Sequence, residues 1–228
     1  MKKLLAILLA AMMLLSVVAC GNTQETEAPE TNETEANAPE NNTPDNDEIP
    51  SDELAYTSAV ELLNLIWNQM PDVLDNNGTE DSEDDLVKTY FVGGMDADGM
   101  PTAEGLAGAC TIGDGSLLDS VYGYPMAEVS KIDDAASIMF MMNQNTFTCA
   151  AYHFTNSADV AAMVNTIESN IQARHWWCGF PEKVVVITLP GDYVIAMFGH
   201  EASFVNPFVE KTTSLVEGAE VVLNNPIA

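Results

Sequence analysis

Lysine and arginine are scarce in this 228-residue chain, where seven of them stand against 35 aspartates and glutamates and leave a formal net charge of −28 at pH 7. Beyond residue 50 there are 26 acidic residues and five basic ones, which are Lys88, Lys131, Arg174, Lys183 and Lys211. Affinity for nucleic acid comes from Lys and Arg contacts with phosphates, so the composition argues against nucleic acid as a partner. It is compatible with a basic partner, and also with acidity that only keeps a surface protein soluble.

Cysteine is also rare, with four residues in the chain. Cys20 belongs to an N-terminal motif described below, which leaves Cys110, Cys149 and Cys178. Three cysteines are too few for a small disulfide-rich scaffold, and an odd number allows at most one internal disulfide. The sequence leaves open whether any two of them pair.

Common catalytic and metal-binding motifs are missing as well. The chain has no Gly-x-Ser-x-Gly sequence and no phosphate-binding loop. The sequence HEASF at 200–204 lacks the second histidine of a zinc-protease motif, and an EF-hand loop with Gly78 at position 6 would have Val73 as its first ligand. We therefore predict no catalytic residue, no metal site and no cofactor. The alternative is an enzyme whose site is assembled from distant residues, with His153 and His200 as candidates.

The clearest positive signal lies in the first 19 residues. Lys2 and Lys3 precede an apolar run over residues 4–15, and small residues follow, which is the pattern of a secretory signal. The apolar stretch of residues 4–19 is 16 residues long, whereas a membrane-spanning helix needs about 20. The pattern therefore favours a cleaved signal over a retained membrane span.

Val-Val-Ala-Cys at 17–20 resembles a bacterial lipobox. That resemblance implies cleavage before Cys20 and a diacylglycerol on its thiol, and lipid chains of this kind hold a protein on a bilayer. We predict that residues 1–19 are a lipoprotein signal peptide and that Cys20 is the lipidation site. The membrane would then be a partner through this lipid, on the extracytoplasmic face of the cell membrane. The alternative is an ordinary signal peptide with a cysteine there by chance.

Residues 20–50 are predicted to be the lipidated cysteine and a disordered acidic tether. Residues 21–50 hold nine acidic residues, four prolines and no lysine or arginine. Such a segment cannot bury enough apolar surface to offset its conformational entropy. As a flexible coil it would span about 30 Å, so its expected role is to space a domain away from the membrane.

The 178 residues that follow are enough for one domain with its own core. Residues 51–116 are predicted to hold an N-terminal helix, capped by Ser51 and closed by Pro71, and then an irregular acidic and Gly-rich segment in which residues 86–92 suit a strand. Residues 117–228 are predicted to be an α+β core domain. Apolar runs in it predict strands at 136–142, 146–154, 184–189 and 193–199.

Helices are expected after Asn156 and after Asn206. The fold class is therefore α+β, with a mainly antiparallel four- to five-stranded sheet in a ββαββα pattern. We expect its helices to pack on one face, behind the N-terminal helix.

The sequence RHWWCGFP at 174–181 follows the helix expected after Asn156. Its Trp-Cys-Gly resembles the start of a thioredoxin active site, but Pro181 stands in place of the second cysteine, and the C-terminal end of a helix raises a thiol pKa. If the helix continues, Cys178 is five whole turns beyond Val160, under the apolar face. We therefore predict that Cys178 is a buried and unreactive thiol.

The same helical phase points Trp176 away from the core and places Trp177 at its side. We predict that Arg174, Trp176 and Trp177 form a candidate contact patch. Two alternatives stay open. The acidic loop at 72–85 or the N-terminal helix covers the tryptophans, or Arg174 pairs with a carboxylate in a structural role.

Four segments of the C-terminal half carry a resemblance to a known family: VYGYP at 121–125, the apolar run at 136–142, IESNIQAR at 167–174 and GDYVIAMFG at 191–199. This half resembles an uncharacterised family of lipoproteins from clostridia and related Firmicutes, described only as a domain of unknown function. The resemblance implies a surface location and a fold, and it supplies no chemistry.

The expected function is that of a lipid-anchored extracytoplasmic surface protein, a non-catalytic module that binds a protein or a small molecule. The alternatives are an extracytoplasmic enzyme and a solute-binding lipoprotein.

Overall fold

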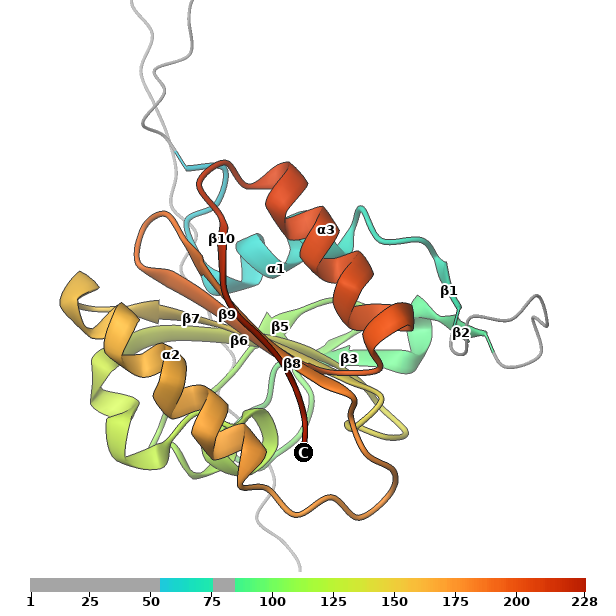
Figure 1. The fold of residues 1–228 in the computed structure, drawn as a ribbon, viewed down its shortest axis with the longest axis horizontal. Coiled ribbons are helices and arrows are strands. Elements are labelled where there is room, and N and C mark those ends of the chain that lie inside the picture. The colour runs from blue at the N-terminus through green and yellow to red at the C-terminus, as the bar shows by residue number, and fades with distance from the viewer. Residues whose placement is uncertain (1–53, 76–84) are drawn as a thin grey trace, which may run out of the picture. The chain divides into compact units, whose positions relative to one another are not determined.

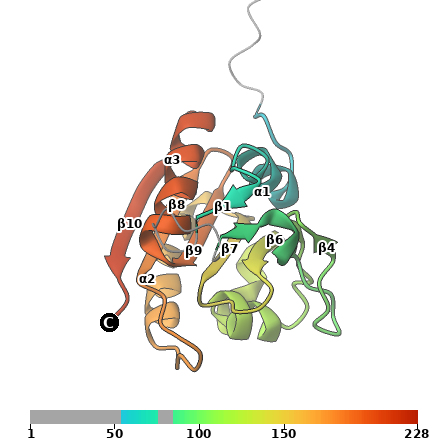
Figure 2. The same ribbon diagram turned by 90° about the vertical axis from the view of Figure 1, so that its right-hand side faces the viewer.

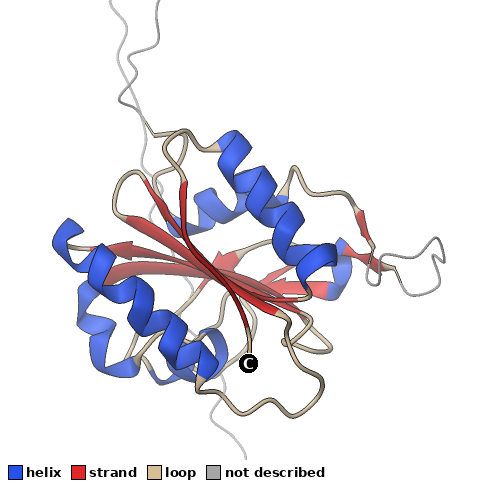
Figure 3. Ribbon diagram, viewed as in Figure 1, coloured by secondary structure: helices blue, strands red, loops and turns tan. Residues whose placement is uncertain are grey.

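The computed structural model describes residues 54–75 and 85–228. The predicted signal peptide, Cys20, the tether at 21–50 and the predicted cap Ser51 lie outside these residues. Residues Ile49–Ala228 form one compact unit. In this unit a twisted sheet lies between two layers of helices (Figure 1, Figure 3).

Within the described residues, eight strands form the central sheet. They are β3 (Phe91–Gly93), β4 (Ala103–Glu104), β5 (Gly108–Ala109), β6 (Ile132–Phe140), β7 (Phe147–Phe154), β8 (Lys183–Leu189), β9 (Tyr193–Gly199) and β10 (Glu220–Pro226). Their order is β10-β8-β9-β7-β6-β3-β4, with β5 also paired to β6, and the paired strands are antiparallel. A separate small sheet pairs β1 (Val73–Leu74) with β2 (Leu86–Val87).

Helices α1 (Ala59–Trp67) and α3 (Asn206–Leu215) cover one face of the sheet. The N-terminus of α1 is capped locally, since Ser58 Oγ accepts a hydrogen bond from the Glu61 amide at 3.2 Å. The Glu61 carboxylate in turn accepts one from the Thr57 amide at 2.8 Å. The helix therefore begins at Ala59. The predicted start after Ser51 is wrong, because residues 54–58 precede the helix and Ser58 caps it.

The opposite face carries α2 (Ser157–Gln172) and two short helical segments, η3 (Leu118–Tyr122) and η4 (Met126–Lys131). Figure 2 shows α2 across the sheet from α1 and α3. Two other short helical segments are η2 (Lys88–Tyr90) and η5 (Glu201–Val205). In the part of the chain that the structure describes, every helix is too short or too polar to cross a membrane.

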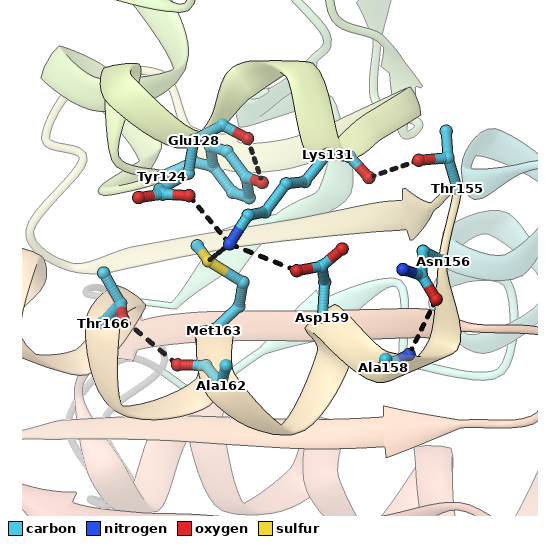
Figure 4. Close-up of polar contacts among 10 residues, drawn as sticks. All are labelled: Tyr124, Glu128, Lys131, Thr155, Asn156, Ala158, Asp159, Ala162, Met163 and Thr166. Atoms are coloured by element: carbon cyan, nitrogen blue, oxygen red, sulfur yellow. Dashed lines mark hydrogen bonds and ion pairs between the residues drawn. The ribbon is translucent and has the colours of Figure 1, made fainter.

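The first turn of α2 is fixed by two polar contacts (Figure 4). Asn156 Oδ1 caps the helix by accepting from the Ala158 amide at 3.1 Å. Lys131 Nζ lies between the carboxylates of Glu128 and Asp159, at 2.9 and 3.2 Å. The η4 segment is thereby tied to the start of α2 on this face of the sheet.

The α+β class is confirmed, but two details of the prediction are wrong. The described part of the sheet has eight strands and not four or five, because β4 and β5 come from the Gly-rich segment predicted to be irregular and β10 adds an edge strand near the C-terminus. The strand predicted at 86–92 overlaps β2 in the small sheet and the start of β3 in the central sheet. The helices also cover both faces and not one. Strands β7 and β9 are buried along nearly their whole length, and strands that are apolar on both sides need a cover on each.

Candidate functional site

Two loops meet at one end of the sheet. One is the turn between β6 and β7, and the other is the segment that joins α2 to β8 (Figure 1). Asn143 Nδ2 donates to the carbonyl oxygen of Cys178 at 2.7 Å, and Asn145 Nδ2 donates to that of Gly179 at 3.0 Å. Gly179 has a φ of +93°, a value that glycine adopts readily. The second loop is therefore held against the first by side-chain amides.

Helix α2 ends at Gln172, six residues before Cys178. The prediction that the helix continues to Cys178 and buries its thiol is wrong, because Cys178 lies in the loop and is exposed. The other two cysteines, Cys110 and Cys149, are buried, and all three are free thiols. The Cys178 thiol at this end of the sheet is therefore accessible to solvent.

Arg174, two residues after the end of α2, binds the loop to the η3 segment. Its Nη1 donates to the carbonyl oxygen of Val121 at 2.8 Å and its Nη2 donates to that of Ser120 at 2.7 Å. Its guanidinium carbon lies 5.2 Å from the ring centroids of both Trp176 and Phe198. Burial lowers the pKa of Arg174, but an arginine stays charged at neutral pH. The hypothesis of an ion pair with a carboxylate is wrong among the described residues, because the guanidinium donates to two backbone carbonyls of η3.

Trp176 packs toward the sheet, with its ring centroid 5.3 Å from that of Phe198. The predicted outward orientation of Trp176 is wrong, because the chain has left the helix before this residue. Its Nε1 is buried and has no hydrogen-bond acceptor in the structure. Trp176 therefore packs between the loop and the sheet, and Trp177 is the tryptophan whose ring is exposed.

Trp177 is 83% exposed, and its ring contacts that of His175 edge-on at 4.6 Å. Three other large apolar side chains on the two loops are also exposed: Met141 at 53%, Met142 at 75% and Phe180 at 72%. We call Met141, Met142, Trp177 and Phe180 the Trp177 surface. The exposure of Trp177 excludes the hypothesis that helix α1 covers it. Most of the acidic loop at 72–85, the other predicted cover, lies outside the described residues.

A hollow of about 350 Å³ lies between the two loops, and its lining brings together Arg174, Trp176 and Trp177, the three residues of the predicted contact patch. Residues 139–145 and 174–178 supply the whole lining, which contains no aspartate or glutamate. The sequence shows the same gap in acidity, since residues 135–158 and 169–181 hold no acidic residue. An otherwise strongly acidic domain thus has an area free of carboxylates at this end, beside its exposed apolar side chains.

The histidines do not converge on a catalytic site. His153 Nδ1 is 2.5 Å from Asp133 Oδ1, and its ring packs on Tyr193 at 4.7 Å. His200 follows the opposite end of β9, because Tyr193 is paired with His153 and Gly199 with Phe147. Six residues of strand separate the two histidines by about 20 Å. Among the residues that the structure describes, no group of three or more His, Cys, Asp or Glu could hold a metal ion.

Comparisons with protein-family models, with curated proteins and with solved structures gave no match to this chain.

Proposed function

We propose that this protein is a lipid-anchored extracytoplasmic binding module, that it is not an enzyme, and that it contacts its partner through the Trp177 surface. The observation that carries the proposal is the gathering of four exposed apolar side chains on two loops that are tied to each other. Single exposed apolar residues are common, whereas a contiguous group of them marks an interaction site. The resemblance to clostridial lipoproteins supports the surface location and not the contact surface.

The position of the chain's entry into the domain also supports this proposal. Leu54, the first described residue, lies beside Gly191, where an added Cβ would be 2.5 Å from Leu54 Cδ1. Gly191 is in the turn between β8 and β9, whereas the Trp177 surface is at the other end of these strands, where Lys183 pairs with Gly199. A chain anchored through Cys20 would enter the domain at one end and present the surface at the other.

The anchor is tested by changing Cys20→Ala in cells that process lipoproteins. A protein held by lipid on Cys20 is expected to move from the membrane fraction to the medium or the soluble extracytoplasmic fraction. Retention of the variant in the membrane fraction would contradict the proposal that lipid on Cys20 anchors the protein.

The contact surface is tested by photo-cross-linking on intact cells, with a photoreactive residue at position 142 or at position 100. Met142 and Met100 are exposed to similar extents, at 75% and 60%, but only Met142 belongs to the Trp177 surface. A discrete covalent adduct is expected from position 142 alone. Equal adducts from both positions, or none from position 142, would contradict the proposed contact surface.

A further inference from the structure

We infer that the Trp177 surface receives a cationic amphipathic peptide segment, whose apolar side chains lie on the surface and whose lysines or arginines lie over the acidic residues around it. This inference rests on the proposed function and adds the chemistry of the partner. It follows from the contrast between an apolar, acid-free centre and a domain in which 26 acidic residues outnumber five basic ones.

The composition of the surface is that of the centre of a protein interface. Interface centres are enriched in tryptophan, phenylalanine, methionine and arginine and depleted in lysine, aspartate and glutamate. The hollow is lined by Trp177, Met141, Met142 and the partly buried Arg174, with no acidic residue in the lining, and the exposed Phe180 follows on the same loop as Trp177. Methionine is flexible and polarisable, so such a surface adapts to apolar side chains of different shapes.

Acidic residues stand at the edge of this centre. The Asp119 carboxylate opposes the lowering of the Arg174 pKa that burial causes. Its Oδ1 accepts a hydrogen bond from Asn170 Nδ2 at 3.2 Å. Glu182 follows Phe180 by two residues and is exposed, with its Oε2 fixed by the Glu201 amide at 2.7 Å. A partner that covers the apolar centre therefore brings its own edges close to carboxylates, and cationic edges are favoured there.

An amphipathic segment matches this arrangement better than a membrane does. Helical peptides bind by laying an apolar face into an apolar groove, and basic ones pair with acidic edges. The cytoplasmic leaflet and other anionic lipid surfaces repel a domain of this charge, since attraction to them requires Lys and Arg. The chain also enters the domain at the end opposite to the Trp177 surface.

The test uses residues 20–228 with Cys20→Ser, because residues Ile49–Ala228 are a compact unit that contains both cores. The probe is a synthetic leucine-lysine peptide of about 18 residues, five helical turns with one apolar face. The comparison peptides are a leucine-glutamate peptide with the same apolar face and a leucine-lysine peptide of scrambled order. Binding is measured by calorimetry at about 50 and about 300 mM NaCl, since salt screens charge attraction that is not specific to the surface.

The expected result is that the amphipathic leucine-lysine peptide binds and that the other two bind far more weakly. The double variant Met142→Gln/Trp177→Ser is expected to lose affinity about tenfold or more at the higher salt concentration. The matched variant Met100→Gln changes a similarly exposed methionine elsewhere and is expected to bind as the parent does. Because both substituted side chains are largely exposed, the double variant should keep the parent's circular dichroism spectrum and melting temperature.

Three results would overturn the inference. Equal affinity of the parent and the double variant would mean that net charge alone attracts the peptide. Surface-dependent binding of the leucine-glutamate peptide, or of vesicles containing anionic lipid, would leave the Trp177 surface as a contact site but refute a cationic partner. Absence of binding by all three peptides would refute the peptide class, while a discrete adduct from position 142 on cells would still uphold the proposed function.

Discussion

At the residue scale, the three thiols of the domain differ in access. Burial raises the pKa of Cys110 to about 11 and that of Cys149 well above its usual value, whereas Cys178 is exposed in the loop. A thiolate is the reactive form, and buried thiols are inert. In the folded domain we expect a thiol reagent to label one cysteine rapidly and the other two only after denaturant is added. Cys178→Ser should remove the rapid phase, and its persistence in this variant would contradict the assignment.

Arg174 makes a second prediction at this scale. Its planar guanidinium donates to two adjacent carbonyls, of Ser120 and Val121, and also stacks on two rings. A lysine ammonium cannot reproduce both donations in that plane. Arg174→Lys is therefore expected to lower the free energy of unfolding by about 1–2 kcal/mol, measured by urea denaturation. An unchanged denaturation midpoint would show that the two carbonyl contacts do not hold the loop.

The contact patch was only partly predictable from its residues. Arg174, Trp176 and Trp177 do lie together, as the sequence suggested, because they are neighbours in the chain. Met141, Met142 and Phe180 were missed, since their approach depends on the amides of Asn143 and Asn145 reaching a loop 34 and 35 residues away. A signal was present, however, in the lack of acidic residues on both segments of a strongly acidic chain.

At the element scale, long apolar runs were informative and short strands were not. The runs at 136–142, 146–154, 184–189 and 193–199 overlap β6, β7, β8 and β9. Strands β3, β4 and β5 are two or three residues long, which is too short for an alternation of apolar and polar residues to be recognised. They form because glycines let backbones approach closely: a Cβ on Gly108 would lie 2.6 Å from the Gly93 carbonyl oxygen. Such contacts depend on the folded arrangement and leave no local pattern.

The end of α2 shows the same limit. Its apolar period extends in the sequence beyond Gln172, so the pattern alone predicted a longer helix. The chain leaves the helix where Arg174 can donate to the η3 carbonyls and Trp176 can pack on Phe198. Tertiary contacts thereby outweigh the local helical period.

The start of α2 gives a prediction about its cap. Asn156→Ala removes the acceptor of the Ala158 amide and is expected to lower the free energy of unfolding by about 1 kcal/mol. Asn165→Ala, an exposed position in the middle of the same helix, is the matched control and should be neutral or slightly stabilising. Urea denaturation of both variants measures the difference, and equal effects would mean that the cap contributes nothing.

At the scale of the whole molecule, the predicted tether and the domain should be independent. The unit Ile49–Ala228 contains both apolar cores, so deletion of residues 21–50 is expected to change the melting temperature by less than about 2 °C, which is below about 1 kcal/mol for a domain of this size. Calorimetry of the deleted and parent chains tests this. A large fall would mean that residues 21–50 pack on the domain.

The net charge of the domain makes the last prediction. With 26 acidic and five basic residues beyond position 50, repulsion among carboxylates opposes the compact state. Salt shortens the range of this repulsion from about 30 Å at 10 mM to about 10 Å at 100 mM, whereas the exposed ion pairs that salt also weakens contribute about 1 kcal/mol or less each.

The melting temperature should therefore rise as NaCl increases from about 10 to about 300 mM. Glu210→Lys/Glu217→Lys changes two exposed carboxylates and is expected to raise the melting temperature at low salt and to flatten its dependence on NaCl. Substitution with glutamine at the same two positions should give half of the charge change and an intermediate slope. A melting temperature that falls with salt in the parent chain would mean that the few ion pairs, at Lys88, Lys131 and Lys183, outweigh the repulsion of the whole surface.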